Sequence, residues 1–344
     1  MLLLKLYSWE TFYARTLSHL STKHTTTKPT PNSKPTTSSD SDPESEEDEE
    51  DDIDDDSDPG TSWFSEHNAP DKVLQFLTDE EFPLAPVNTN ISKDNGDEQA
   101  PSILDLGTGN GSMLALLRKR GGYKGVMVGI DYSIRSVQLA RELQRLRIHS
   151  AYLSDSEDEG SDGDDEGGKE GNGEGGDTNI RFEEWDILHG DVYETTTTTT
   201  TTTSEEGSNG KGKVDWFPYD KGGFDIVLDK GTFDAVSLSD EVIPDADGAA
   251  EGHASGKTVQ RRVCERYPGI VRGLVRKGGF VVVTSCNWTE EELVAWFTRA
   301  DTSSGGGGGE EEDKFVVWGR VEYPRFRFGG REGQGVCTVC FQRV

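Results

Sequence analysis

Short apolar runs alternate with segments of helical periodicity along most of the chain. Apolar runs that begin at residues 103 and 126 are each followed by a segment in which apolar residues recur every three or four positions, at 112–119 and at 134–147. A short apolar run indicates a buried strand, and the longer period indicates a helix packed on it. The alternation therefore predicts an α/β fold with a doubly wound, mostly parallel sheet.

The same pattern continues toward the C-terminus. Thr289 and Glu292 have the spacing of a capping box, which marks the start of a helix. The last two apolar runs, joined by about a dozen residues, predict a hairpin-like pair that completes a seven-strand sheet with an antiparallel C-terminal edge strand. We expect strands at 180–186, 224–229, 279–285, 315–323 and 336–343, a helix at 258–276 that is interrupted near Pro268, and a helix at 289–299.

Five low-complexity segments divide this pattern. They are rich in Ser, Thr, Gly or acidic residues and lie at 21–60, 154–178, 195–213, 245–256 and 301–313. Such segments cannot bury enough apolar surface to fold, so we expect a disordered linker at 21–60 and disordered insertions in surface loops. The predicted organisation is a helical N-terminal segment at 1–20, the linker, and one domain at 61–344 that carries the other four insertions.

The net charge is concentrated in these segments. The chain has 344 residues and a formal net charge of −30, and the segment 40–58 alone holds 14 acids and no Lys or Arg. A second segment, 155–177, holds 11 acids and one Lys. The other residues together are close to neutral. We expect no direct nucleic-acid binding, although acidity confined to loops argues only mildly against it.

The most informative segment is the glycine-rich run after the first apolar strand. Asp105 leads into Gly107, Gly109 and Gly111, and helix-like residues follow directly. A strand, a tight turn and a helix N-terminus in this order form a ligand site in α/β proteins. Asp131 ends the second apolar run and can accept hydrogen bonds from both hydroxyls of a ribose. A nucleoside-containing cofactor is therefore predicted.

The glycine spacing distinguishes between cofactors. A dinucleotide-binding loop has the pattern G-x-G-x-x-G, but its third glycine position is Ser112 or Leu114 here, depending on the register. A G-x-G-x-G loop preceded by an acid better suits a cationic ligand without phosphates. We predict S-adenosyl-L-methionine (AdoMet), with NAD, FAD and a glycine turn that holds no ligand as alternatives.

Further candidate residues follow the third and fourth strands. Asp229 ends the fourth strand, where it would border the transferred methyl group or the amino group of the cofactor. Alternatively, Asp229 would cap the next helix or pair with Lys230. Asp186 and Ile187 end the third strand, where they are placed to contact adenine.

The chain has four cysteines: Cys264, Cys286, Cys337 and Cys340. Cys337 and Cys340 have ligand-like spacing, but no second pair completes a tetrahedral site, and residues three apart on a strand point to opposite faces. We interpret all four as structural thiols of a reducing compartment and predict no bound metal. No segment is apolar enough to span a bilayer. Residues 1–39 resemble a transit peptide, so organelle import is an alternative.

Several motifs resemble one enzyme family, in the same order along the chain. The run Asp229-Lys-Gly-Thr-Phe-Asp and the run Ser285-Cys-Asn-Trp are the most restrictive, whereas the glycine loop identifies only a superfamily. These motifs resemble the seven-strand methyltransferases that modify translation elongation factor 1-alpha on lysine. The matching segments are 103–111, 129–133, 229–235, 284–289 and 328–331.

The resemblance implies a Rossmann-like methyltransferase fold with AdoMet as the cofactor. In that family a Trp-Phe pair precedes the core, which Trp63-Phe64 resembles, and residues 8–13 resemble the upstream helix. The segment 1–20 is therefore expected to belong to the enzyme, although an insertion of about 40 residues leaves its docking open. The implied cofactor-binding residues are Trp63, Asp105, Gly107, Thr108, Gly109, Gly111, Asp131, Tyr132, Asp186, Ile187 and Asp229.

The acceptor lysine is expected to reach the cofactor past Asp229 and the loop after the fifth strand. Asp229, Asn287 and Trp288 are the implied catalytic residues, with positioning roles and no general base among them. Trp288 would form an aromatic wall for the lysine or lie buried between sheet and helix. Asn287 would orient the amine or cap the next helix. His67 and His189 lie near predicted site loops, and we assign neither as a base.

The resemblance implies that the protein partner is elongation factor 1-alpha. We also expect a monomeric, cytoplasmic enzyme, with the nucleus as a second compartment and no membrane contact. Two alternatives to this function remain. One is methyl transfer to another protein or to a small molecule. The other is an AdoMet-binding module without catalytic activity, whose acidic insertions recruit partners.

Overall fold

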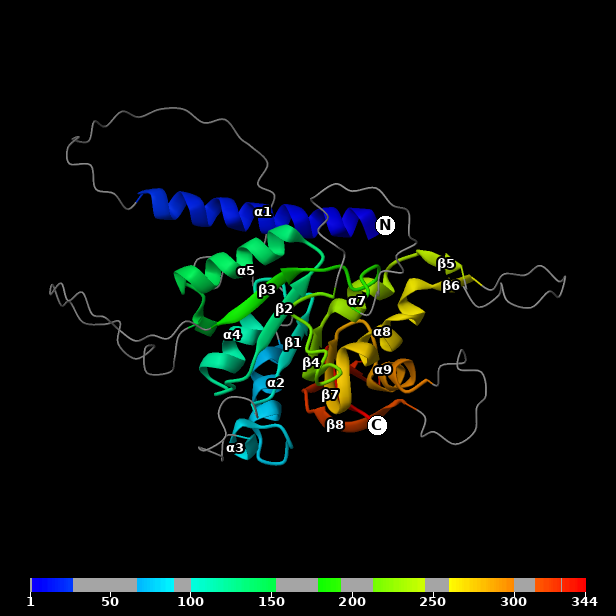
Figure 1. Cartoon of the computed structure of the whole chain (residues 1–344). Coiled ribbons are helices and arrows are strands. Elements are labelled where there is room, and N and C mark those ends of the chain that lie inside the picture. Colours follow the sequence, from blue (N-terminus) through cyan, green and yellow to red (C-terminus); the bar gives the residue numbers. More distant parts are fainter. Residues whose placement is uncertain are drawn as a thin grey trace, which may run out of the picture.

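Seven strands form one central sheet in the computed structural model (Figure 1). The structure describes residues 2–26, 67–89, 100–152, 179–192, 213–244, 260–299, 313–328 and 330–344. The strand order across the sheet is β3-β2-β1-β4-β7-β11-β8. Its strands are β1 (Ile103–Leu106), β2 (Met127–Asp131), β3 (Ile180–Glu184), β4 (Phe224–Lys230), β7 (Val275–Ser285), β8 (Phe315–Val321) and β11 (Cys337–Arg343).

The sheet is mostly parallel. Strands β3, β2, β1, β4 and β7 are parallel to one another, and β11 is antiparallel to both β7 and β8. The predicted α/β class, the seven strands and the antiparallel C-terminal strand are confirmed, and β11 lies one position inside the edge strand β8. Cys337 and Cys340 of β11 belong to opposite core clusters, as predicted for residues three apart on a strand.

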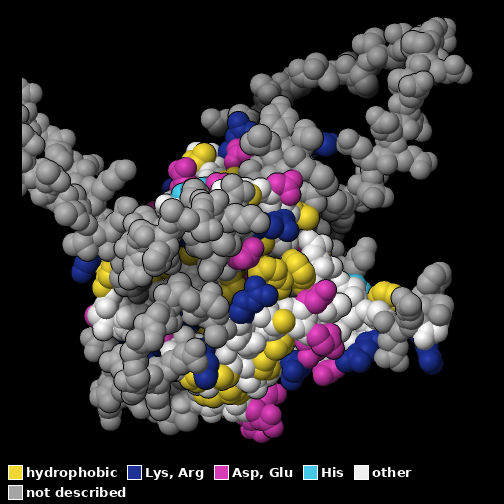
Figure 2. All heavy atoms as spheres, turned by 90° about the vertical axis from the view of Figure 1, so that its right-hand side faces the viewer, with side chains coloured by type: hydrophobic (Ala, Val, Ile, Leu, Met, Phe, Trp, Pro, Cys, Tyr) yellow, Lys and Arg dark blue, Asp and Glu magenta, His cyan; other side chains and the backbone are white. Residues whose placement is uncertain are grey.

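Helices cover both faces of the sheet (Figure 1). One core cluster joins the sheet to α2, α4 and α5, and the other joins it to α7, α8 and α9. Figure 2 views the side on which α8 and α9 lie in Figure 1, and shows hydrophobic side chains gathered there with acidic and basic ones around them. The helices are α1 (Leu2–Thr26), α2 (Ala69–Thr78), α3 (Pro86–Thr89), α4 (Ser112–Lys119), α5 (Ile134–Leu146), α7 (Thr232–Ser237), α8 (Tyr267–Leu274) and α9 (Glu290–Phe297).

The N-terminal helix α1 packs against α5 (Figure 1). Tyr13 and Leu20 of α1 are buried in the core cluster that also contains α5. Glu10 forms an ion pair with Arg135 at 3.4 Å. The helix continues to Thr26, so its last six residues fall in the segment that was expected to be a disordered linker. The remainder of the linker, residues 27–60, lies outside the described residues, as do nearly all residues of the other four low-complexity segments.

Two helix starts follow the local sequence. The hydroxyl of Ser133 accepts a hydrogen bond from the backbone N–H of Ser136 at 3.2 Å and caps α5. Thr289 and Glu292 form the predicted capping box at the start of α9. These caps fix where the chain turns from a strand end into a helix.

The expectation of a helix over 258–276 is wrong in its extent. Residues 260–262 form strand β6, the helix α8 begins at Tyr267, and β7 begins at Val275. Pro268 lies in the first turn of α8, where its missing N–H group costs no hydrogen bond. The proline therefore starts the helix instead of interrupting it.

Two small antiparallel sheets were not predicted. Strand β5 (Val242–Pro244) pairs with β6 (Gln260–Arg262), and β9 (Arg325–Phe328) pairs with β10 (Arg331–Gln334). The turn between β9 and β10 contains Gly330 with φ of +80°. A two-residue hairpin turn requires a residue that tolerates this conformation, and glycine does so without strain.

Candidate functional site

A pocket of about 290 Å³ opens at the carboxyl ends of β1, β2 and β4. In open α/β sheets this edge, where the strand order reverses, is the usual ligand site. The glycine loop after β1, the end of β2, the loop after β3, the start of α7 and one side of α1 form the wall. Seven predicted cofactor-binding residues line the pocket: Gly107, Thr108, Gly109, Asp131, Tyr132, Asp186 and Ile187.

The two glycines of the loop after β1 that line the pocket have different reasons to be glycine. Gly107 and Gly109 have φ of +59° and +58°, a conformation that L side chains rarely adopt. A Cβ at Gly107 would lie 2.3 Å from Oγ1 of Thr232, so this glycine permits the close approach of α7. A Cβ at Gly109 would have only the hydroxyl of Tyr13 nearby, at 3.5 Å. Gly109 thus leaves backbone open to a ligand.

Gly111, the third glycine of the loop, does not line the pocket. It precedes α4 with φ of +76°, and a Cβ there would lie 2.6 Å from the ring of Phe182. This glycine therefore allows α4 to pack closely on β3. Two of the three predicted glycines therefore line the pocket, and the third lies outside its lining.

Asp131 joins the glycine loop to the end of β2. Its carboxylate accepts hydrogen bonds from the backbone N–H groups of Gly109 (3.2 Å) and Ser133 (2.9 Å) and from the hydroxyl of Ser136 (2.7 Å). The side chain is 5% exposed, and burial raises its pKa. These bonds fix the carboxylate at the pocket wall, where its remaining lone pairs can accept from hydroxyl groups of a ligand.

Asp105 lies beneath the pocket and not in its lining. The Thr108 hydroxyl donates a 2.8 Å hydrogen bond to its carboxylate, and burial raises the pKa of Asp105 to about 6. Lys230 lines the pocket, and burial lowers the pKa of its amino group while Asp105 and Asp229 oppose that shift. The floor of the pocket therefore carries buried groups of both signs.

The loop after β3 forms a second polar wall. Asp186 accepts a hydrogen bond from the N–H of Leu188 (2.9 Å), and its other oxygen lies 2.8 Å from Nδ1 of His189. Nε2 of His189 lies 3.4 Å from a carboxylate oxygen of Glu241. The hydrogen bond to Asp186 raises the pKa of His189 despite partial burial. His189 and Glu241 both line the pocket, and Glu241 had no signal in the sequence.

Two aromatic side chains of α1 complete the wall and were not predicted as site residues. Trp9 and Tyr13 line the pocket, and their rings are stacked with centroids 5.9 Å apart. The segment 8–13 was expected to be helical, but only the three-dimensional structure brings it to the glycine loop. Trp63, which was predicted to bind the cofactor, lies outside the described residues.

Asp229 is not in the pocket lining. It is 1% exposed, and its carboxylate accepts hydrogen bonds from the N–H groups of Thr232 (2.9 Å) and Phe233 (3.1 Å) and from the hydroxyl of Tyr267 (2.8 Å). Burial raises its pKa to about 7. These contacts are those of the alternative interpretation, in which Asp229 caps the next helix.

The turn after β7 is organised by Asp234, a residue that the sequence did not single out. Its carboxylate accepts from the hydroxyl of Ser285 (2.5 Å) and from the N–H of Cys286 (2.8 Å). The Ser285 oxygen in turn accepts from the N–H groups of Asn287 and Trp288. This network places both residues at the carboxyl end of β7, beside β4.

Asn287 and Trp288 differ in their surroundings. Asn287 is exposed, whereas Trp288 is half-buried and its ring stacks on Phe233 with centroids 5.9 Å apart. Neither residue lines the pocket, and the buried indole N–H of Trp288 has no hydrogen-bond partner among the described residues. Trp288 therefore packs against Phe233 of α7 and Trp296 of α9.

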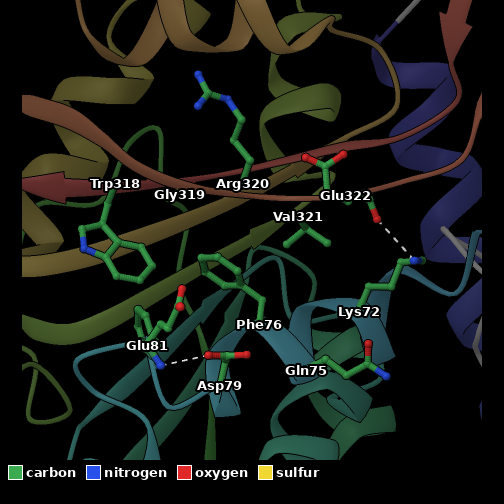
Figure 3. Close-up of a pocket in the computed structure, with 11 residues that line it drawn as sticks. Lys72, Gln75, Phe76, Asp79, Glu81, Trp318, Gly319, Arg320, Val321 and Glu322 are labelled. Atoms are coloured by element: carbon green, nitrogen blue, oxygen red, sulfur yellow. Dashed lines mark hydrogen bonds between the residues drawn. The ribbon is translucent and has the colours of Figure 1, made fainter.

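A second, more open hollow of about 720 Å³ lies between α2 and β8 (Figure 3). Phe76 and Trp318 form its apolar floor, with ring centroids 5.7 Å apart, and Nζ of Lys72 donates to the backbone carbonyl of Glu322 at 3.3 Å. The first turn of α2 connects the two cavities, because Pro70 lines the pocket and Lys72 lines the hollow. The hollow contains none of the predicted cofactor-binding residues.

Among the described residues, no group of three or more His, Cys, Asp or Glu side chains is arranged to hold a metal ion. Their helices include none with the length and hydropathy needed to cross a membrane. None of the four cysteines forms a disulfide, and three of them are buried.

Known proteins are similar to this chain over most of its length. Residues 97–155 match the family described as methyltransferase domain. The chain is 32% identical to protein-lysine N-methyltransferase EFM4 of Saccharomyces cerevisiae over 284 residues, which cover 83% of each protein. It is 26% identical to the human EEF1A lysine methyltransferase 2 over 287 residues, which cover 83% of this chain and 78% of the human protein.

A solved structure, the magnesium protoporphyrin IX methyltransferase of Synechocystis PCC 6803 with bound SAM, aligns with 80% of this chain and 79% of its own. The TM-score of that alignment is 0.37 and the sequence identity is 10%.

Proposed function

The chain belongs to the family of protein-lysine N-methyltransferase EFM4 and EEF1A lysine methyltransferase 2, and from this membership we propose that it transfers a methyl group from AdoMet to a lysine side chain of translation elongation factor 1-alpha. One observation carries the proposal: the pocket at the carboxyl ends of the parallel strands combines the glycine loop with the buried carboxylate of Asp131. This combination suits a nucleoside whose ribose and cationic tail both require binding.

The pocket fits AdoMet through its open backbone and its carboxylates. Gly109 would face the tail of the cofactor, since a Cβ there would enter the pocket. Asp131 would hold the ribose, and Asp186 and Ile187 would hold the adenine. Trp9 and Tyr13 would cover the bound molecule from α1. When bound, AdoMet supplies an electrophilic methyl group on a sulfonium.

The chain's own contribution is positioning and exclusion of water. A methyl acceptor must be neutral, and a lysine with its ordinary pKa of about 10.4 requires about 4–5 kcal/mol to lose its proton at pH 7. Apolar surroundings and a nearby cation offset part of this cost because both disfavour the ammonium form. Holding the amine in line with the methyl group replaces a bimolecular encounter.

The predicted catalytic residues are proposed to act as positioning residues. Asp229 holds the N-terminus of α7, and Thr232 and Ala235 of that helix line the pocket. Asn287 and Trp288 follow β7, the strand beside β4, and would border the path of the acceptor lysine. The remaining predicted residues, Asp105 and Gly111, would support the glycine loop from beneath.

The partner and compartment of this chain follow from the same proposal. Elongation factor 1-alpha is the protein substrate, the enzyme acts as a monomer in the cytoplasm, and neither nucleic acid nor a membrane takes part in the reaction. A protein substrate is supported by the similarity to a protein-lysine N-methyltransferase and an EEF1A lysine methyltransferase.

Methylation of purified elongation factor 1-alpha with radiolabelled AdoMet tests the proposal. We expect label in the factor with the full chain, strong loss with Asp131→Ala, and no loss with Glu80→Ala, an exposed acid far from the pocket lining. An unlabelled factor together with a labelled protein in a cell lysate would assign another substrate. Bound AdoMet without any transfer would indicate a module without catalytic activity.

A further inference from the structure

The β9–β10 hairpin contains the motif at 328–331, which the proposed site does not use. It leaves the sheet after β8 and returns at β11, whose first residue Cys337 pairs with Ser285 at the end of β7. The hairpin therefore projects from the same edge of the sheet as the cofactor pocket. The Cys337 thiol also lies 3.3 Å from the backbone carbonyl of Trp288, within the turn that would border the acceptor lysine.

The base of the hairpin is joined to the pocket wall through α2. Tyr323 and Val336, which flank the hairpin, are buried against Ala69 in a small apolar cluster. The next residue, Pro70, lines the cofactor pocket. The base of the hairpin is therefore packed one residue away from a pocket-lining residue, which holds the hairpin on the same side of the sheet as the pocket.

The hairpin presents charged side chains on one face and an exposed aromatic ring on the other. Arg325 and Arg327 are exposed and lie on one face of β9, because alternate residues of a strand share a face. Phe326 lies on the other face opposite Gly333, where a Cβ would fall 2.5 Å from its ring. Phe326 thus packs over the glycine while remaining 56% exposed, and the two arginines are exposed on the other face.

The charge of this element is opposite to that of the chain. Residues 325–334 contain three Arg and one Glu, whereas the whole chain has a formal net charge of −30. Arginine is enriched in protein interfaces because its planar fork binds carboxylates with two hydrogen bonds. A short basic hairpin on an acidic protein therefore attracts, at that one place, the carboxylates of a partner protein.

We propose that the arginine face of the β9–β10 hairpin binds an acidic patch on the protein substrate beside the methylated lysine, with Arg325 and Arg327 contacting its carboxylates. This inference rests on the proposed function, because it assigns the contact to a protein methyl acceptor. Such an interaction sets the affinity and the orientation of the protein substrate. The two arginines themselves do not touch the methyl donor.

Steady-state methylation of purified elongation factor 1-alpha by the full chain tests the inference. The double variant Arg325→Glu/Arg327→Glu is compared with Lys124→Glu/Arg145→Glu, which makes the same change in net charge at exposed residues near the opposite edge of the sheet. We expect KM for the factor to rise by about tenfold or more in the hairpin variant, with kcat and AdoMet affinity unchanged, and no rise in the control. Arg325→Lys/Arg327→Lys should restore much of the affinity.

A KM that does not change in the hairpin variant would overturn the inference and leave the proposed function intact. The same measurement in a chain that lacks 40–58 separates the substrate from the chain's own acidic segment. If the effect of charge reversal disappears in that chain, the arginines bind the acidic segment and the inference is wrong. If the wild-type chain transfers no methyl group, the proposed function fails. Calorimetric titration of the factor into the wild-type chain and into the hairpin variant still decides whether the arginines bind it.

Discussion

The backbone N–H of Gly109 donates a hydrogen bond to the carboxylate of Asp131, with 3.2 Å between nitrogen and oxygen. This bond joins the loop after β1 to the end of β2, two segments that are 22 positions apart. The residue that would bind the ribose therefore also holds the loop that would bind the cofactor tail. Changes at either residue are expected to affect both parts of the pocket.

Asp131→Ala is expected to weaken AdoMet binding by ~1–3 kcal/mol, the usual effect of removing a hydrogen bond to a charged group. It also removes the acceptor of three hydrogen bonds, from Gly109, Ser133 and Ser136, so a loss of thermal stability should accompany the loss of affinity. Isothermal titration calorimetry measures the affinity. An affinity equal to that of the wild type would contradict the assignment of the ribose to the end of β2.

Gly109→Ala and Gly107→Ala should have different consequences. Both changes put a side chain at positive φ, which costs roughly 1–2 kcal/mol. At Gly107 the new Cβ also collides with Thr232, so we expect a large loss of stability. At Gly109 the new Cβ enters the pocket, so AdoMet affinity should fall more than stability does.

Thermal melting and calorimetry on the two glycine variants separate these effects. If Gly109→Ala binds AdoMet as tightly as the wild type does, the open backbone at this position has no role in binding. A Gly107→Ala variant as stable as the wild type would mean that α7 tolerates a wider spacing from the loop.

Tyr13→Ala is expected to weaken AdoMet binding because it removes a ring that lines the pocket. Leu17→Ala, on the same helix and packed against the core but not in the pocket lining, is the matched control. Both changes weaken the packing of α1, so only the difference between the two affinities reports on Tyr13 itself. Equal affinities would assign the effect to the docking of α1.

Asp229→Ala should destabilise the fold by ~1–3 kcal/mol, because it removes the acceptor of three hydrogen bonds. Asp229→Asn keeps one oxygen for the N–H groups at the start of α7, so its loss of stability should be smaller. Chemical denaturation measures both values. If the alanine variant is stable but inactive, Asp229 acts on the reaction directly and the cap is unimportant.

The stability of the chain is expected to fall as the pH rises from about 4 to about 7. Burial raises the pKa of Asp229 to about 7, from an ordinary value of 3.8. The folded protein therefore binds this proton more tightly than the unfolded chain does, and the contribution is present below pH 3.8 and lost as the pH passes about 7. Asp229→Asn should flatten the pH dependence of the free energy of unfolding, and an unchanged slope would show that the carboxyl ionises freely in the fold.

The sequence predicts the parts of the site that depend on neighbouring residues. The glycine loop and Asp131 each follow a short apolar strand, and adjacent parallel strands bring their ends together. The capping box of Thr289 was predictable for the same reason, since its partner is three positions away.

Residues that depend on distant parts of the chain could not be predicted. Tyr13 reaches the pocket only because α1 packs on α5, and no local pattern encodes that contact. Asp234 organises the turn after β7 from 51 positions away, through a carboxylate that could as well have capped its own helix. The extent of α8 was mispredicted because one proline pattern fits both a helix interruption and a helix start.

Because α1 forms part of its wall, the methyl-donor site is built from two segments of the chain. A single proteolytic cleavage would separate them. Cleavage anywhere between Thr26 and His67 would remove the covalent link to α1, which among the described residues packs against α5, forms the Glu10–Arg135 ion pair and lines the pocket beside the glycine loop. Donor affinity would then fall on dilution, as the released peptide dissociates. We expect the cleaved enzyme to lose activity when it is diluted and to regain it when a peptide of residues 2–26 is added.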